Sequence, residues 1–253
     1  MTEHRKQFLE SGYTVVRQYL STSDMERLDR RVAEQAPDQS LRHQYSQSSD
    51  PKRYEYSLSR AVPDDGKRKR EGTESDTFQL ESLTALVKDL CPDLMPAECF
   101  CIVSEPGSED QPAHTDSIPT DESDSAVTEW QSTLHYIGIL IPLQNTDDRC
   151  GKTAVIPGSH KPGIVVEKEE HVSLSRGDIL VLDGRTVHRG LANKQTPNNT
   201  DPTIGVRRIC FFTYTRPDIT DGNALAYEIG NVDIAKYIGK QKKKRKKLRK
   251  TVS

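Results

Sequence analysis

The sequence predicts a mainly β fold with flanking α-helices, in which the strands form a double-stranded β-helix, the cupin-like jelly roll. Two observations lead to this prediction. Beyond residue 97, short runs of branched and aromatic residues are separated by Gly, Pro and Asp clusters, without helical periodicity between them. Before residue 97, apolar residues recur at helical spacing. Many short strands without intervening helices form a sandwich or barrel, and a ligand cavity is expected between its two sheets.

Three helices and one strand are expected in the N-terminal part. Residues 4–10 can form a short helix, and residues 13–16 a strand. A capping box at residues 23–26 is expected to open the second helix, whose apolar face consists of Met25, Leu28 and Val32. The third helix ends at Cys91-Pro92, and its helical spacing is set by Leu80, Leu83, Val87 and Leu90.

Six further strands are expected, at 98–104, 133–143, 153–156, 171–174, 179–182 and 206–214. Residues 1–238 are predicted to form a single domain around them. Within it, the segment 39–77 is rich in Ser, Asp, Lys and Arg and contains scattered Pro and Gly, which predicts a polar insertion or lid. Residues 239–253 are predicted to form a basic, disordered tail, because like charges repel and little apolar surface offsets the chain entropy.

The charge of the chain is divided unevenly. The net charge is -2, but residues 240–250 hold nine Lys or Arg and no acid, which leaves 27 basic against 38 acidic residues elsewhere. Such a tail can act as a nuclear-import signal bound by an import receptor, or as an anchor to nucleic acid or an anionic membrane. The alternatives are a solvated tail and a contact with the acidic body. A second basic run at 67–70 favours the nuclear role.

The compartment that the sequence indicates is intracellular, either cytoplasmic or nuclear. No stretch approaches the roughly 20 apolar residues of a membrane helix, and the N-terminus lacks the apolar core of a signal peptide. Five cysteines are an odd and sparse set, which suits a reducing compartment. Cys99 and Cys101 lack partners at zinc-like spacing, so we expect two buried thiols on one strand face.

Two separated fragments carry residue types that bind iron. Side chains two residues apart in an extended segment leave the same face, so His114 and Asp116 can contact one ion. A second isolated histidine, His188, follows another predicted strand. Two imidazoles and one carboxylate form the facial triad that binds non-haem Fe(II) and leaves positions open for a cosubstrate and oxygen. The competing interpretation of the His-x-Asp pair is a surface turn or a hydrogen-bonded pair.

Polar residues in two predicted strands are candidates to bind a cosubstrate. A dicarboxylate that chelates iron at one end needs its far carboxylate fixed, and a guanidinium does this with two parallel charge-assisted hydrogen bonds. Arg207 and Arg208 begin the last predicted strand on opposite faces, so one of the two can point inward. Polar groups that enter a central strand can also contact the cosubstrate, and here the candidates are Thr133 and Tyr136.

Three motifs in sequence order resemble one known family. Gln-Pro-Ala-His-Thr-Asp occupies 111–116, Gly-Lys-Thr-Ala-Val-Ile-Pro-Gly-Ser-His-Lys occupies 151–161, and Arg-Gly-Asp-Ile-Leu-Val-Leu-Asp-Gly-Arg-Thr-Val-His occupies 176–188. They resemble the phytanoyl-CoA dioxygenase family of Fe(II)- and 2-oxoglutarate-dependent oxygenases. The opening at 8–16 is also similar, so the resemblance spans most of residues 7–215. It implies that the iron ligands are His114, Asp116 and His188, and that Arg207 binds the far carboxylate of 2-oxoglutarate.

The reaction that the resemblance implies consumes 2-oxoglutarate and O₂, releases succinate and CO₂, and hydroxylates an unactivated C–H bond. The substrate is expected to be a small molecule or an acyl compound, and the acidic residues near His114 favour a neutral or cationic one. The family often has a Ser two residues after the distal His, where this chain has Gly190. Two rival classes are a non-catalytic jelly-roll binding protein and a cupin-type metal-dependent isomerase.

Overall fold

The computed structural model describes residues 2–35, 42–44, 50–58, 78–117, 132–161, 168–198, 200 and 204–216. The predicted basic tail at 239–253 and the basic run at 67–70 lie outside the described residues, as does most of the predicted insertion at 39–77. Within the described ranges, no helix is long and apolar enough to cross a membrane.

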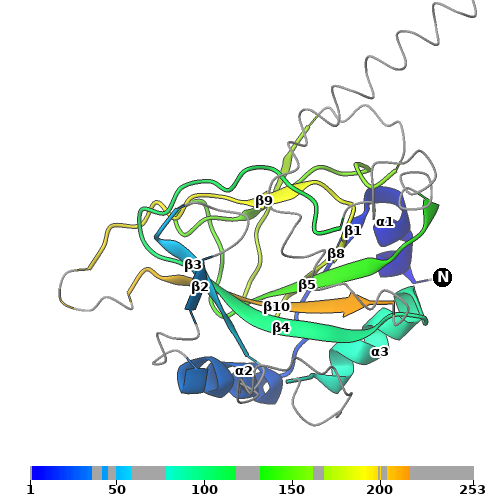
Figure 1. Cartoon of the computed structure of the whole chain (residues 1–253), viewed down its shortest axis with the longest axis horizontal. Coiled ribbons are helices and arrows are strands. Elements are labelled where there is room, and N and C mark those ends of the chain that lie inside the picture. The colour runs from blue at the N-terminus through cyan, green and yellow to red at the C-terminus, as the bar shows by residue number, and fades with distance from the viewer. Residues whose placement is uncertain are drawn as a thin grey trace, which may run out of the picture.

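Three helices and ten strands make up the described part of the chain (Figure 1). The helices are α1 (Glu3–Ser11), α2 (Thr22–Gln35) and α3 (Glu81–Leu90). The strands are β1 (Tyr13–Val16), β2 (Arg42–Gln44), β3 (Arg53–Ser57), β4 (Met95–Ser104), β5 (Tyr136–Pro142), β6 (Thr153–Val155), β7 (Glu170–Val172), β8 (Ile179–Asp183), β9 (His188–Gly190) and β10 (Arg207–Thr215).

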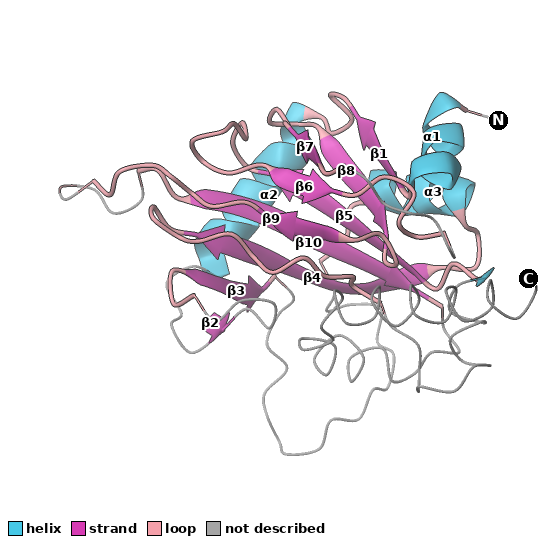
Figure 2. Cartoon of the chain, turned by 90° about the horizontal axis from the view of Figure 1, so that it is seen from above, coloured by secondary structure: helices cyan, strands magenta, loops and turns pink. Residues whose placement is uncertain are grey.

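Two antiparallel sheets lie face to face. The large sheet has the strand order β1-β8-β5-β10-β4-β3-β2, and the small sheet has the order β7-β6-β9. In Figure 1, α2 and α3 lie below the large sheet and β9 lies above it, so helices and small sheet cover opposite faces. Figure 2 shows β6 and β9 in front of the large sheet and α2 behind it. This mainly β double-stranded β-helix with flanking helices confirms the predicted fold class.

The large sheet is buried on both faces. Along β10, Cys210 and Phe212 belong to the apolar cluster between the large sheet and the helices, which also contains Leu28 of α2 and Leu83 of α3. We call this cluster the helix-side layer. The alternate residues Ile209 and Phe211 belong to the second apolar cluster, together with Tyr13, Ile102, Leu140, Val155, Val172, Leu174, Leu180 and Leu182. We call this second cluster, which lies between the two sheets, the inter-sheet layer.

Most predicted elements are present, with ends shifted by a few residues. The predicted helix faces are buried, including Met25, Leu28 and Val32 in α2 and Leu83, Val87 and Leu90 in α3. The two buried thiols expected on one strand face are confirmed, since Cys99 and Cys101 both belong to the helix-side layer. Strand β9 was not predicted, because its residues, His188, Arg189 and Gly190, include none of the Val, Ile, Thr, Tyr, Phe or Trp that favour strands.

The predicted capping box of α2 is wrong by two residues. The helix begins at Thr22, so Ser21 is the residue that can cap it. Its hydroxyl oxygen accepts from the Asp24 N–H at 3.1 Å, and Asp24 Oδ2 accepts from the Ser21 N–H at 3.3 Å. The capping box is therefore formed by Ser21 and Asp24, where the prediction had Ser23 and Glu26.

Part of the predicted polar insertion belongs to the sheet. Strand β3 pairs with β4 and extends the large sheet, with Arg53 opposite Ser104 and Tyr56 opposite Cys101. Its helix-side face carries the apolar side chains of Tyr56 and the following Leu58, both buried. Its other face carries polar residues that are also buried, Arg53 and Glu55. The strand was missed because composition alone resembles that of a loop when one buried face is charged.

Candidate active site

The segment 111–117 pairs with β9 and positions the candidate site. The His114 N–H donates to the His188 carbonyl, and the His188 N–H donates to the His114 carbonyl, each at 2.9 Å. Two residues further, the Asp116 N–H donates to the Gly184 carbonyl at 2.9 Å. Because opposed side chains of an antiparallel pair leave the same face, the two imidazoles lie side by side. Their ring centroids are 4.5 Å apart.

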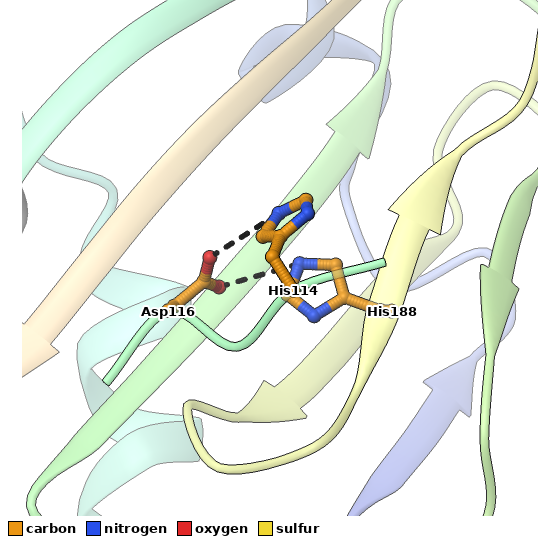
Figure 3. A group of neighbouring side chains, drawn as sticks. All are labelled: His114, Asp116 and His188. Carbon is orange, nitrogen blue, oxygen red and sulfur yellow. Dashed lines mark ion pairs between the residues drawn. The ribbon is translucent and has the colours of Figure 1, made fainter. Parts of the chain in front are cut away.

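The three side chains of this site point toward one another (Figure 3). The Asp116 carboxylate faces both rings, with Oδ2 at 3.5 Å from His188 Nε2 and Oδ1 at 3.9 Å from His114 Nε2. One potential ligand atom from each residue lies within 4.8 Å of the other two. In the described part of the chain, no other group of three His, Cys, Asp or Glu side chains meets this condition.

Backbone carbonyls determine the tautomer of both histidines. His114 Nδ1 lies 2.8 Å from the Pro112 carbonyl oxygen, and His188 Nδ1 lies 3.0 Å from the Thr186 carbonyl oxygen. Since a carbonyl oxygen can only accept, each Nδ1 carries the proton and each Nε2 keeps its lone pair. His114 Nε2 and Asp116 Oδ2 are buried without a hydrogen-bond partner. Buried acceptors that face one another without a donor fit a metal ion.

The electrostatics of the site also favour a cation. Burial, and then the neighbouring His188, lower the pKa of His114 to about 3, so this imidazole is neutral at physiological pH. Burial raises the pKa of Asp116, and His188 opposes that shift. Neutral imidazole is the form that binds a metal, and a divalent cation would stabilise the ionised form of the buried carboxylate. The donor set of two nitrogens and one carboxylate suits non-haem Fe(II).

Comparison with protein-family models identifies the family. The model of phytanoyl-CoA dioxygenase (PhyH) matches residues 8–196. The chain belongs to the phytanoyl-CoA dioxygenase family. This places it among the Fe(II)- and 2-oxoglutarate-dependent oxygenases, and the three residues of Figure 3 lie within the matched range. Among curated proteins, none matches the chain by sequence.

Solved structures share the fold of this PhyH-family chain. HygX from Streptomyces hygroscopicus, with nickel, 2-oxoglutarate and hygromycin B bound, is 16% identical with a TM-score of 0.61, over 86% of this chain and 88% of HygX. The carbocyclase SnoK from nogalamycin biosynthesis is 17% identical with a TM-score of 0.59, over 88% and 89%. The epimerase SnoN, in complex with Fe3+, alpha ketoglutarate and nogalamycin RO, is 15% identical with a TM-score of 0.59, over 84% and 82%.

A pocket between the two sheets adjoins His188. Its apolar lining is Ile102, Leu140, Ile209 and Phe211. Arg207 also lines it and is 2% exposed, whereas Arg208 is half-buried and leaves the opposite face of β10. Arg207 Nη1 donates to the Gly151 carbonyl at 2.9 Å, and Nη2 donates to Ser104 Oγ at 2.9 Å. These contacts hold the guanidinium beside the candidate iron ligand His188.

A second arginine, which was not predicted as a site residue, lines the same pocket. Arg53 is 1% exposed, and its Nη1 donates at 2.8 Å to Ser104 Oγ, the hydroxyl that also accepts from Arg207. The signal that could have identified Arg53 is the alternation of Tyr54, Tyr56 and Leu58. That alternation indicates a strand and places Arg53 on the face opposite Tyr54 and Tyr56.

Gly190, the departure from the family's Ser, is explained by its neighbours. A Cβ at this position would lie 2.4 Å from Gln111 Oε1, 3.0 Å from Arg53 Nη1 and 3.1 Å from Arg207 Nη2. Gln111 Oε1 already accepts from the Gly190 N–H at 2.7 Å. Polar groups of Gln111 and Arg53 therefore occupy the space that a Ser side chain would need.

The two polar candidates near β5 are Thr133 and Tyr136. Thr133 is half-buried and precedes the strand. Tyr136 begins the strand and packs on the inter-sheet layer, with its ring against Gly184, where an added Cβ would lie 2.7 Å from Tyr136 Cδ1. Neither is among the described residues that line the pocket. A contact of Thr133 or Tyr136 with the cosubstrate stays a prediction.

Proposed function

We propose that this protein is a dioxygenase that hydroxylates an unactivated C–H bond of a small molecule, with release of succinate and CO₂. His114, Asp116 and His188 are the proposed ligands of Fe(II). The observation that carries the proposal is the convergence of two Nε2 lone pairs and one carboxylate at a buried point, with His114 Nε2 and Asp116 Oδ2 lacking other partners. Bound Fe(II), together with 2-oxoglutarate and O₂, would supply the oxidising power for the C–H bond.

The chain's own residues would bind and orient the reactants. The carbonyls of Pro112 and Thr186 hold both imidazoles in the tautomer that binds a metal. Arg207 is the proposed partner of the far carboxylate of 2-oxoglutarate, since its guanidinium is buried in the pocket beside His188. Arg53 adds a second guanidinium on the same wall. The apolar residues of the inter-sheet layer would exclude water from the reacting groups.

A small molecule is the proposed substrate class. HygX holds hygromycin B and SnoN holds nogalamycin RO, so two structures of this fold have a small molecule bound. A non-catalytic binding protein would not need a buried arginine at the pocket beside three convergent ligand atoms. An isomerase of the cupin type would be expected to bind its metal through more than two histidines. The described residues contain one candidate metal-binding group, and it has two histidines.

Succinate formation tests this proposal. The full chain, supplied with Fe(II), 2-oxoglutarate and O₂, is expected to release succinate slowly without substrate and faster with its substrate, whose product gains one oxygen atom. His114→Ala should release none. Well-folded wild-type protein that binds iron and yields no succinate under any condition would contradict the proposal, and a product without added oxygen would replace hydroxylation by another oxidation.

The basic tail is the subject of a separate proposal. We propose that residues 239–253 bind an anionic partner, either nucleic acid or an import receptor, because nine basic residues lie close together at 240–250. Deletion of 240–253 should alter anion binding or location in the cell and leave succinate formation without substrate unchanged. A large loss of succinate formation would contradict a tail that acts apart from the catalytic domain.

A further inference from the structure

A buried acidic side chain lies on the pocket-facing wall of the large sheet. Glu55 on β3 is 7% exposed and stands opposite Ile102 of β4, which lines the pocket. Directly opposed residues of an antiparallel pair point to the same face. Arg53, two residues earlier on β3, also lines the pocket. The carboxyl group of Glu55 is therefore directed to the interior between the two sheets.

This carboxyl group has no partner of opposite charge. Among the described residues, no hydrogen bond or ion pair reaches it. The charged group that acts on it electrostatically is another carboxylate, Glu98 of β4. Burial, and then Glu98, raise the pKa of Glu55 to about 8. A carboxyl group in such surroundings is costly to ionise, and a bound cation would offset that cost.

The surroundings of Glu55 suit an alkyl chain that ends in a cation. Phe100 of β4 and Phe211 of β10 lie on the same inner face and form an edge-to-face pair with centroids 5.1 Å apart. Ile102 and Ile209 continue this wall. Apolar and aromatic surfaces bind methylene groups, and ring faces also attract a cation. A phosphate or carboxylate at this point would instead meet Glu55 and Glu98.

The position of Glu55 relative to the triad limits the size of the ligand. Asp116 lies over β5, since a Cβ on Gly138 would be 3.4 Å from Asp116 Oδ2. The order of strands from there is β5, β10, β4 and β3. Three strand spacings of about 4.8 Å put Glu55 about 14 Å from that point across the sheet. The residue of β5 level with Glu55 is Pro142, four residues from Gly138, which adds an offset of about 14 Å along the strands. A molecule that reaches both points would carry its cation several bonds from the reacting carbon.

We propose that Glu55 binds an ammonium group of the substrate, so that this oxygenase acts on a small molecule bearing an aliphatic amine. The inference rests on the proposed function and names the substrate class of the same site. The charged groups on the same inner face are Glu98 of β4, which acts on Glu55, and Arg53 of β3 and Arg207 of β10, which line the neighbouring pocket. The far carboxylate of 2-oxoglutarate would compensate Arg207, so the amine binds best after the cosubstrate.

Paired probes of equal shape test the subsite. The full chain is loaded with Zn(II), which is diamagnetic and inert, and with 2-oxoglutarate. It is then titrated with n-butylammonium chloride or with 1-butanol while saturation-transfer NMR follows binding. We expect the wild type to bind n-butylammonium more tightly than 1-butanol. Glu55→Gln should weaken the binding of n-butylammonium by at least about tenfold, which is the effect of losing a charged hydrogen bond. The binding of 1-butanol should not change.

Matched variants separate a binding role from a structural one. Glu81→Gln removes the same charge from the exposed first turn of α3 and should leave both probes unchanged. Glu55→Asp keeps the charge on a shorter side chain and should retain part of the preference for n-butylammonium. It also serves as the second variant if Glu55→Gln fails to fold. Equal binding of the two probes by the wild type, or equal binding of n-butylammonium by wild type and folded Glu55 variants, would overturn the proposal.

The outcome can be separated from that of the proposed function. If the protein forms succinate but shows no Glu55-dependent preference for n-butylammonium, the amine subsite is rejected and the proposed oxygenase function stands. If the protein forms no succinate but binds n-butylammonium through Glu55 in the metal-free state, the amine subsite stands and the proposed oxygenase function is rejected.

Discussion

The two faces of the large sheet at β3, β4 and β10 are both largely buried, but the inner face combines apolar side chains with buried charged ones. On the helix-side layer, Cys210, Phe212 and Tyr214 are at most 3% exposed and pack against α2, α3 and their neighbours. On the inner face, Arg207 is just as inaccessible, at 2%. Beside it on the same wall lie Arg53, Glu55 and Ser104, all buried. Burial alone therefore does not distinguish the core of this protein from its candidate site.

Burial of apolar and of charged side chains has opposite effects on the stability of the folded state. Apolar side chains stabilise the folded state when they leave water, by about 25 cal/mol per Å² of buried surface. Buried charges are costly unless they are paired and hydrogen-bonded, and replacement by apolar residues is often neutral or stabilising. A strand selected for stability alone would thus be apolar on both faces. The charged inner face of β3, β4 and β10 is better explained by ligands that bind there.

The largest expected effect is on the inner side, at the triad. His188→Ala should reduce Fe(II) affinity by more than about 100-fold, because changing a mere partner of a metal ligand already costs about 10- to 100-fold. Metal content after dialysis and succinate formation measure this. The control is His171→Ala on β7, whose ring pairs with Glu169 at the surface of the small sheet. Iron content equal to that of the wild type would contradict the assignment of His188.

The helix-side layer should respond in stability and not in binding. Leu83→Ala removes a side chain that is 0% exposed between α3 and the large sheet. The free energy of unfolding should fall by about 2 to 5 kcal/mol, as for other buried Leu to Ala changes. Denaturant unfolding measures this loss. The affinity for 2-oxoglutarate should stay within twofold, and a large loss of affinity would break the proposed separation of the two faces.

The next effect distinguishes the two arginines that begin β10. Arg207→Gln should raise the dissociation constant of 2-oxoglutarate by about 30-fold or more, since truncating a buried charged partner costs about 2 kcal/mol or more. Binding of 2-oxobutyrate, which lacks the far carboxylate, should change little. Arg208→Gln, from the other face, is the matched control and should affect neither ligand. A reversed pattern would assign the far carboxylate to Arg208.

The smallest effect probes the crowding at Gly190. Gly190→Ser places a Cβ against Gln111 Oε1 and Arg53 Nη1, so both groups must shift. We expect 2-oxoglutarate affinity to fall by about tenfold or less, and Arg53→Ala in the same chain to recover part of the loss, because groups in contact are not additive. Calorimetric titration of the single and double variants checks this. Additive losses would mean that Arg53 and residue 190 do not compete for space.

The sequence revealed most of the fold and part of the site for identifiable reasons. His114 and Asp116 could be recognised because two-residue spacing in an extended segment puts both on one face, and the motif containing His188 supplied the third member. The alternation along β10 limited the inward arginine to Arg207 or Arg208, and the family resemblance favoured Arg207. Arg53 and Glu55 were not recognised as wall residues, because the alternation that marks their strand stands in a segment whose composition is that of a loop.

Long-range pairing accounts for the remaining differences. Gln111 is close to Gly190 only because the segment 111–117 runs along β9, and the residues of β9 are not ones that favour a strand. The start of α2 was misplaced because Ser21 and Ser23 offer equivalent hydroxyls in sequence. Which of them caps the helix depends on the connection that follows β1, where the Leu20 N–H donates to the Gly177 carbonyl.

The most direct test of the central claim is an anaerobic titration of the Fe(II)-loaded full chain with 2-oxoglutarate, followed by visible absorption. Chelation of the keto acid by iron at the triad should produce a charge-transfer band that saturates at one 2-oxoglutarate per chain. The band should be absent in His114→Ala and should need more 2-oxoglutarate in Arg207→Gln. A well-folded, iron-loaded wild type that gives no band, or a band that persists in His114→Ala, would contradict the claim.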